Sequence, residues 1–297
     1  MPFLEPGDVH DETYLHLRDD CHVFAVESRR HVEELWSNAA PFVDPKLPLR
    51  ARRLFHPAYW ELLLAASLVD AALPVAPNNQ RRYRSKGPDI QVGITPVTAW
   101  IEATAVTPGQ GVDQVREGGN RVRTVPDGSI KLRLLAAIHE KKTKHDHYVR
   151  TGLVSADEPF VIAINDALVP SAFLELRVPR IVRCVFPFGD EVLEVDLAKH
   201  SITGSHHEHS DSVSKSSGAS VPTDLFERPD YAGISAVLHS AAEVWNPGSV
   251  LDAGFILVHN PLATSPLPHG FLPRGREYWK ESGELKCKMH CAPLARD

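Results

Sequence analysis

The sequence predicts an α/β fold with a central mixed β-sheet flanked by helices. A strongly apolar helical stretch at residues 56–73 is followed by two strand-like segments at 89–94 and 97–106. A second strong helix, at 129–152, is followed by the apolar run PFVIAIN, which is typical of a strand buried on both faces. Two later runs, AGISAVLHS and AGFILVHNPLA, carry the same strand signature.

Periodicity and end signals define three helices. Apolar side chains recur every three to four positions over residues 12–36, which predicts one helix there. In the helix at 56–73, Pro57 suits the first turn, and Pro74 stops the helix. In the third helix, Ser129 can cap the start and Gly152 can cap the end.

The C-terminal half predicts strands around one low-complexity segment. Residues 180–197 are strand-like with a Gly-Asp turn, and the tail from Pro266 is rich in Pro and Gly with weak periodicity. The Ser- and His-rich segment at 204–222 predicts a mobile loop, and a split into two domains there is the alternative. The expected units are a helical extension (1–50), a core (51–203), the flexible loop (204–222) and C-terminal strands completing the same domain (223–297).

Composition favours a cytoplasmic globular protein and excludes several classes. Hydrophobic content of 43% and charged content of 24% are ordinary for a globular protein, and no run of about 18 apolar residues predicts a membrane span. The acidic N-terminal segment lacks the apolar core of a signal peptide. Four scattered cysteines indicate a reducing compartment. The net charge of −6 argues against a generally basic nucleic-acid coat and leaves room for a local basic patch.

Two carboxylates lie in otherwise apolar strand segments. If a hairpin turns at Thr95-Pro96, Asp89 faces Glu102 across the strand pair, with Cβ atoms about 4.5–5.5 Å apart. Two carboxylates that close repel each other unless a cation lies between them, and a divalent metal can bridge hard oxygens. The alternative is structural: Asp89 begins a strand after a Gly-Pro turn, and Glu102 pairs with an arginine.

A third carboxylate, Glu61, lies on the apolar stripe of the helix at 56–73. It precedes Leu64 and Leu68 by three and seven residues, so it shares their helix face. An acid at such a position lies at the edge of the stripe and reaches solvent, or it points toward a metal held by the other two carboxylates.

This pattern resembles the PD-(D/E)XK nuclease superfamily, the restriction-endonuclease-like fold. That fold has a core ordered α-β-β-β-α-β, in which a helix supplies a Glu, one strand an Asp after Pro, and the next strand an E-x-K. The matching residues here are Glu61, Asp89 in GPD, and Glu102 in WIEAT. The resemblance covers about residues 52–166 and implies an α/β, restriction-endonuclease-like core with extra C-terminal strands.

The chain departs from this pattern at Thr104, which stands where the family has its lysine. In the superfamily that lysine can come from the following helix, which here offers Lys141, Lys142 and Lys144. Lys141 and Lys142 lie seven residues beyond Leu134 and Leu135, so both are expected near the apolar face, and Lys142 is slightly preferred. The stretch KHDHY also resembles the Q-x-x-x-Y helix motif of RecB-like members, with Lys in place of Gln. The alternative is that these lysines form a solvated basic face.

The resemblance implies metal-assisted hydrolysis of phosphodiester bonds. Asp89 and Glu102 would bind Mg²⁺ or Mn²⁺ with the backbone carbonyl of Ala103, and Glu61 would hold the metal directly or through water. Nucleic acid, with DNA favoured over RNA, is the expected partner, no membrane is expected, and a homodimer is left open. Two basic runs flank the Glu61 helix and are expected to contact phosphates, unless they are merely solvated surface; their residues are Arg52, Arg53, Arg81, Arg82, Arg84 and Lys86.

Three further features leave the function open. The tract HHEH at 206–209 is interpreted as part of a disordered polar loop. Cys287, His290 and Cys291 form a tight group, but structural zinc needs four ligands and the sequence offers no clear second pair. Because Thr104 replaces the family's lysine, a second hypothesis is a catalytically inactive nuclease-fold protein that binds nucleic acid or protein. A third hypothesis is a metal hydrolase that is not a nuclease.

Overall fold

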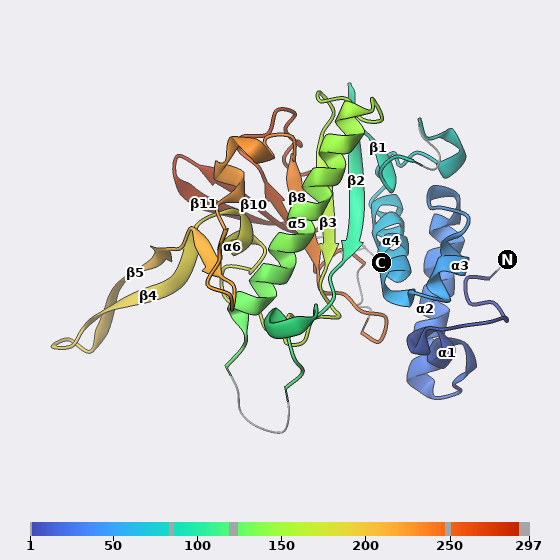
Figure 1. The fold of residues 1–297 in the computed structure, drawn as a ribbon, viewed down its shortest axis with the longest axis horizontal. Helices are drawn as coiled ribbons and strands as arrows, with labels where there is room; N and C mark the ends of the chain where they lie inside the picture. The colour runs from blue at the N-terminus through green and yellow to red at the C-terminus, as the bar shows by residue number, and fades with distance from the viewer. Residues whose placement is uncertain (1, 83–85, 95, 119–123, 247–250, 291–297) are drawn as a thin grey trace, which may run out of the picture.

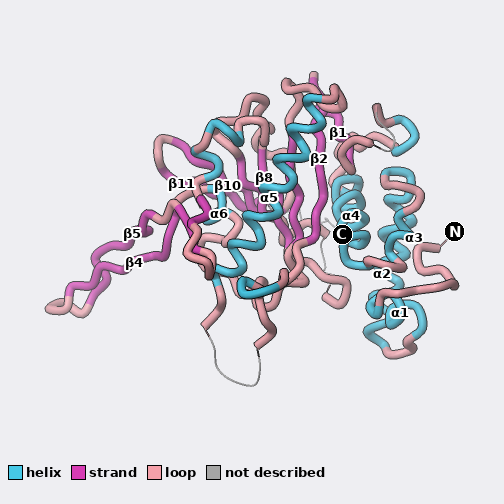
Figure 2. Tube along the Cα trace, viewed as in Figure 1, coloured by secondary structure: helices cyan, strands magenta, loops and turns pink. Residues whose placement is uncertain are grey.

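The structure is a computed structural model that describes residues 2–82, 86–94, 96–118, 124–246 and 251–290. It confirms the α/β class: a mixed sheet lies between two helical layers (Figures 1 and 2). One hydrophobic core, with Trp60, Ile90 and Ile101, fills the space between the N-terminal helices and the sheet. The other, with Trp100 and Phe160, lies under helix α5. Among the described residues, every helix is too short or too polar to cross a membrane.

Seven strands of the described chain form the central sheet, in the order β1-β2-β3-β8-β9-β10-β11. Strands β2, β3 and β8 run parallel, β9 and β10 run parallel to each other, and the pairs β1/β2, β8/β9 and β10/β11 are antiparallel. The later strands therefore extend the same sheet as the earlier ones. The bounds are β1 (Ile90–Ile94), β2 (Val97–Ala105), β3 (Phe160–Asn165), β8 (Ala236–Ser240), β9 (Ile256–His259), β10 (Gly275–Glu281) and β11 (Glu284–His290).

The N-terminal helices α1 (Glu12–Asp19), α2 (Val23–Ala39), α3 (Leu47–Ala51) and α4 (Phe55–Asp70) cover one face. The single helix predicted over 12–36 is wrong, because the chain breaks after Asp19. Asp20 takes an extended conformation, and its carboxylate accepts the N–H of His22 at 2.9 Å. Two adjacent aspartates also oppose the dipole at a helix C-terminus. Helix α4 is tied to the sheet by Trp60, whose indole N–H donates to the Ala163 carbonyl at 3.1 Å.

Helix α5 (Asp127–Arg150) crosses the opposite face, in front of β2 and β3 in Figure 1. It begins two residues before the predicted cap, and Ser129 lies inside it. Asp127 occupies the first turn and accepts a hydrogen bond from Arg180 at 2.9 Å, so a distant ion pair fixes the start. Gly152, at φ +71°, follows the helix end as predicted.

The segment after β3 differs most from its prediction. Residues 182–185 form helix α6 (Val182–Val185) and not a strand, and the expected Gly-Asp turn lies inside β4 (Phe188–Asp196). The range expected to be a loop contains most of β5 (Ser201–His209), with β6 (Ser212–Ser214) and β7 (Ser220–Pro222). Strands β4 and β5 form a ribbon that projects from the body (Figure 1). The short 3₁₀ turns are Ala40–Phe42, Asn78–Gln80, Gly111–Asp113, Leu225–Glu227 and Pro229–Tyr231.

Candidate functional site

The predicted hairpin register is present in the structure. Ile94 pairs with Val97 and Ile90 with Ile101, so Asp89, directly before β1, is aligned with Glu102 on β2. On the outer side of β1, Val75 forms an isolated antiparallel bridge with Val92. The order from α4 to β3 is therefore helix, rudimentary strand, two strands, helix, strand.

Asp89 carries a partly buried carboxylate and lies directly before the first residue of β1. Its Oδ2 accepts the N–H of Ala103 at 2.8 Å, and within the described residues no lysine, arginine or histidine lies within ion-pair distance. Burial, followed by the charges of Glu102 and Glu61, raises the pKa of Asp89 to about 8, against the lowering effect of the Ala103 N–H. Ala103 thus contributes a backbone donor here; the predicted role of its carbonyl as a metal ligand stays a prediction.

Glu102 is fully buried and faces α5, as the two-residue alternation with Trp100 and Thr104 predicts. Its Oε1 lies 3.2 Å from Lys141 Nζ and 2.5 Å from Lys144 Nζ, and its Oε2 accepts the Tyr148 hydroxyl at 3.2 Å. Burial alone would lower the pKa of Lys144, but the Glu102 carboxylate outweighs it and the pKa is raised. One buried carboxylate therefore holds two ammonium groups.

The preference for Lys142 is wrong in geometry. Its Nζ lies 2.7 Å from Asp146 of the same helix, away from Glu102. The seven-residue spacing correctly places Lys142 on the same side of α5 as Leu135. That side of the helix lies opposite the β6–β7 ribbon and Tyr231, and not against the sheet. The face on the sheet is the buried stripe that contains Ile138, Lys141, His145 and Tyr148.

Glu61 is buried on α4 and forms an ion pair with Arg50, with Arg50 Nη2 2.6 Å from Glu61 Oε2. Burial raises the pKa of Glu61, and the Arg50 guanidinium opposes that shift. The prediction that Glu61 lies at a solvent-reaching edge of the apolar stripe is wrong, because α4 is buried on nearly every side and Glu61 is buried against Arg50. No pattern in the sequence identified Arg50 as its partner.

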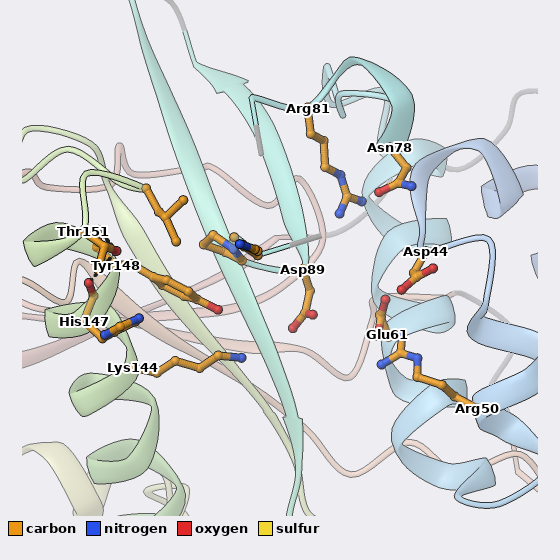
Figure 3. Close-up of a pocket in the computed structure, with 14 residues that line it drawn as sticks. Asp44, Arg50, Glu61, Asn78, Arg81, Asp89, Lys144, His147, Tyr148 and Thr151 are labelled. Carbon is orange, nitrogen blue, oxygen red and sulfur yellow. Dashed lines mark hydrogen bonds and ion pairs between the residues drawn. The ribbon is translucent and has the colours of Figure 1, made fainter. Parts of the chain in front are cut away.

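Two of the three predicted carboxylates, Asp89 and Glu61, line a cleft of about 740 Å³ between α4 and α5. Figure 3 shows Asp89 between Lys144 and Tyr148 on one side and Glu61 and Arg50 on the other. Glu102 lies behind this wall and reaches the cleft through Lys144 and Tyr148. No sequence pattern pointed to two further cleft residues, Asp44 and His147. The lining is completed by Asn78, Arg81, Lys86, Gly87, Pro88, Thr151 and Leu153.

The basic runs are only partly available to a ligand. Arg81 is buried at the cleft wall, where its guanidinium donates to the Phe42 carbonyl. Arg82 forms an ion pair with Glu158 and lies over the Trp100 ring, and Arg52 pairs with Glu5 at 3.0 Å.

The other basic positions differ from these three. Arg53 is exposed outside the cleft lining, and Lys86 is exposed and lines the cleft. Arg84 lies outside the described residues. Of the six predicted positions, Arg81 and Lys86 line the cleft, whereas Arg52 and Arg82 form ion pairs that hold segments of the chain together.

Comparisons with protein-family models, with curated proteins and with solved structures gave no match. The case for any function therefore rests on the residues of this chain and their arrangement.

Proposed function

We propose that this chain is a divalent-metal-dependent nuclease of the PD-(D/E)XK type, acting on DNA in preference to RNA. The observation that carries the proposal is that Asp89, Glu61 and Lys144 line one cleft, with Glu102 directly behind Lys144. The element order from α4 to β3, with the Val75 bridge as a rudimentary first strand, supports the α-β-β-β-α-β resemblance.

The cleft residues fit Mg²⁺ or Mn²⁺ by the chemistry of their donors. Asp89 and Glu61 present carboxylate oxygens, the ligands that hard divalent cations prefer. Burial, followed by the charges of Glu102 and Glu61, raises the pKa of Asp89, so a cation bound beside Asp89 would favour its ionised form. Bound between these carboxylates, the metal would acidify a water molecule and offset charge on the phosphate.

The chain itself supplies the positive charge that Thr104 cannot. Lys141 is buried and suffices to neutralise Glu102, so Lys144 is a surplus cation on the same carboxylate. The side chain of Lys144 is 43% exposed and lines the cleft, where it can stabilise developing negative charge on a phosphate. Arg81 and Lys86 extend this positive wall toward the rest of a nucleic-acid strand.

A catalytically inactive binding module is the second candidate, and it has its own observation. Glu61 is engaged by Arg50, and Glu102 is held by Lys141, Lys144 and Tyr148. If these contacts persist in solution, only Asp89 is left for a metal, and the cleft would bind an anion without hydrolysing it.

The two candidates are separated by a cleavage assay combined with calorimetry. The wild-type protein is incubated with supercoiled plasmid and with structured RNA, in Mg²⁺, in Mn²⁺ and in chelator. The nuclease predicts metal-dependent nicking and metal binding in the absence of nucleic acid. Nucleic-acid binding without cleavage or metal uptake would establish the binding module in its place.

The reduced basic wall gives a prediction of its own. Lys86→Ala is expected to weaken DNA binding several-fold and to lower the slope of log affinity against log salt by about 1, because one phosphate contact is lost. Arg82→Ala is the matched control from the same run, since its pairing with Glu158 predicts a lower melting temperature and an unchanged salt slope. Fluorescence anisotropy across a salt titration measures both. A slope unaffected by Lys86→Ala would remove Lys86 from the interface.

A further inference from the structure

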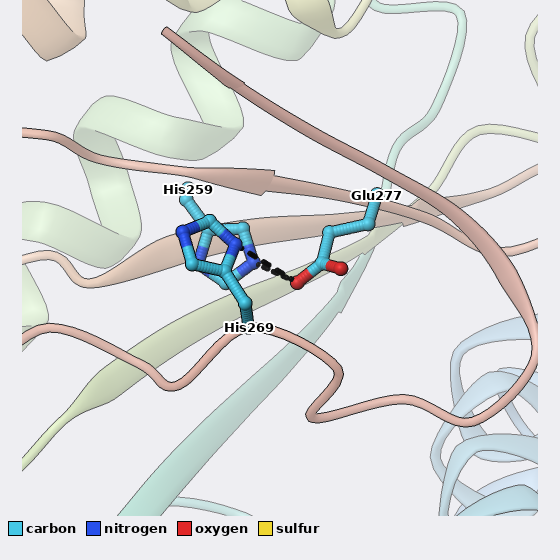
Figure 4. Close-up of side chains that lie close together, drawn as sticks. All are labelled: His259, His269 and Glu277. Atoms are coloured by element: carbon cyan, nitrogen blue, oxygen red, sulfur yellow. Dashed lines mark hydrogen bonds and ion pairs between the residues drawn. The ribbon is translucent and has the colours of Figure 1, made fainter. Parts of the chain in front are cut away.

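A second cluster of ionisable side chains lies at the other end of the sheet from the cleft. Figure 4 shows His259, His269 and Glu277 directed toward one another, and their ligand atoms all lie within 4.8 Å of one another. His290 joins them, with Nε2 2.7 Å from Glu277 Oε2. Strands β3 and β8 lie between this cluster and the strands β1 and β2 beside the cleft.

Strand pairing explains why these residues meet. Leu257 pairs with Glu277, so His259, two residues later on β9, points to the same face of the sheet. Gly275 pairs with His290, which places His290 diagonally from Glu277 on that face. The fourth residue, His269, comes from the loop between β9 and β10. Buried Leu267 and Phe271 anchor that loop on either side of it.

The contacts within the cluster converge on one carboxylate. Glu277 Oε1 lies 2.6 Å from His259 Nε2 and 3.4 Å from His269 Nδ1, and it also accepts the Gly270 N–H at 2.8 Å. Glu277 is only 3% exposed and His259 is 6% exposed, whereas the His269 side chain is 59% exposed. Three imidazoles thus surround one buried carboxylate, and one of them closes the cluster from the solvent side.

From this geometry we propose a zinc site formed by His259, His269, Glu277 and His290. Imidazole nitrogen and carboxylate oxygen are zinc ligands, and four of them make a tetrahedral set. With metal–ligand distances of about 2.0–2.2 Å, tetrahedral ligand atoms lie roughly 3.3–3.5 Å apart. Glu277 Oε1 lies 2.6 Å from His259 and 3.4 Å from His269, whereas Oε2 lies 2.7 Å from His290. His290 would therefore have to turn toward the other two imidazoles to complete one tetrahedral shell.

The proposed ligands come from two sequence segments for which the sequence alone suggested no function. His290 belongs to the CKMHC group, and His259 begins the Pro-bounded loop that leads to His269. Cys287 is not part of the set, because it pairs with Tyr278 and therefore points to the opposite face from Glu277 and His290. The ion would bind β9, β10, β11 and the loop together at the end of the sheet, independently of any nuclease activity.

The test uses full-length protein without an affinity tag, stripped with chelator and then dialysed against Zn²⁺. Mass spectrometry of metal content is expected to find one tightly held zinc per chain, and Co²⁺ substitution is expected to give the visible absorption of four-coordinate cobalt. His269→Gln should weaken binding at least about 100-fold, more than loss of an outer hydrogen-bond partner costs. Because His269 is exposed, this variant should fold normally.

Two controls distinguish this cluster from other donors. The variant with His206, His207 and His209 all replaced by Gln removes the exposed histidines of β5 and should keep the zinc. Cys287→Ser should also keep it, with an unchanged cobalt spectrum. Protein that retains no zinc, or zinc lost with the β5 histidines while His269→Gln keeps it, would overturn the proposal and leave a hydrogen-bonded cluster around Glu277.

Discussion

Asp89→Asn is expected to abolish metal-dependent cleavage and, at pH 8.5, to make the protein more stable. The carboxylate is held beside Glu102 and Glu61 in a partly buried position that favours its neutral form. The amide of Asn has the shape of the Asp89 carboxylate but carries no charge. It therefore removes an essential metal ligand and, in the same step, relieves an unfavourable interaction in the metal-free protein.

The stability effect has a defined pH dependence. The folded-state pKa of about 8 lies above the ordinary value of 3.8, so the folded protein holds this proton more tightly than the unfolded chain. The stabilising contribution of Asp89 is complete below pH 4 and is lost as the pH rises through 8. At pH 8.5 the substitution should gain on the order of a few kcal/mol, because each unit of pKa difference between folded and unfolded chain is worth about 1.4 kcal/mol, and the melting temperature should rise by several degrees. At pH 5, where Asp89 is protonated in the folded protein and ionised only in the unfolded chain, the gain should be clearly smaller than at pH 8.5.

Melting curves in chelator at both pH values measure this effect, and plasmid nicking in Mg²⁺ measures the loss of activity. Asp157→Asn, at an exposed carboxylate, is the control and should change neither. A lower melting temperature for Asp89→Asn at pH 8.5 would refute the electrostatic account of the site. Undiminished nicking by the same variant would refute its role as a metal ligand.

Lys144→Ala is expected to lower metal-dependent cleavage by a factor of roughly 100 to 1,000, the usual cost of losing one preorganised donor to a developing anion. Folding should survive, because Lys141 and Tyr148 still hold Glu102. The effect should fall on kcat more than on substrate affinity, and Lys144→Arg should restore part of the activity, because it keeps a cation at the same place.

Helix α5 supplies two matched controls for that result. Lys142→Ala should cleave normally, because its ammonium pairs with Asp146 outside the cleft. Lys141→Met should act mainly on stability, since it removes the buried partner of Glu102. Equal losses of activity in Lys142→Ala and Lys144→Ala would show that α5 contributes only its overall positive charge and that Lys144 has no specific role at the reacting phosphate.

The local pattern predicted the elements around the cleft well where sequence-near contacts govern them. The Thr95-Pro96 sequence signal and the alternation of β2 are short-range features, and they were enough to predict the register that aligns Asp89 with Glu102. The helical period likewise predicted α4, which carries Glu61. Predictions failed where a competing contact was distant in the chain: the start of α5 depends on Arg180, and residues 182–185 are helical.

The sequence by itself determined the α/β class, the order of the elements around the cleft and the positions of three carboxylates, because hydrophobic periodicity acts over a few residues. Tertiary structure decided the rest. It brought Lys144, and not Lys142, into contact with Glu102, because packing determines which face of α5 meets the sheet. It also committed Arg52 and Arg82 to ion pairs with distant acids. Strand pairing brought His259 and His290 to one carboxylate, and no spacing within the linear chain encodes that contact.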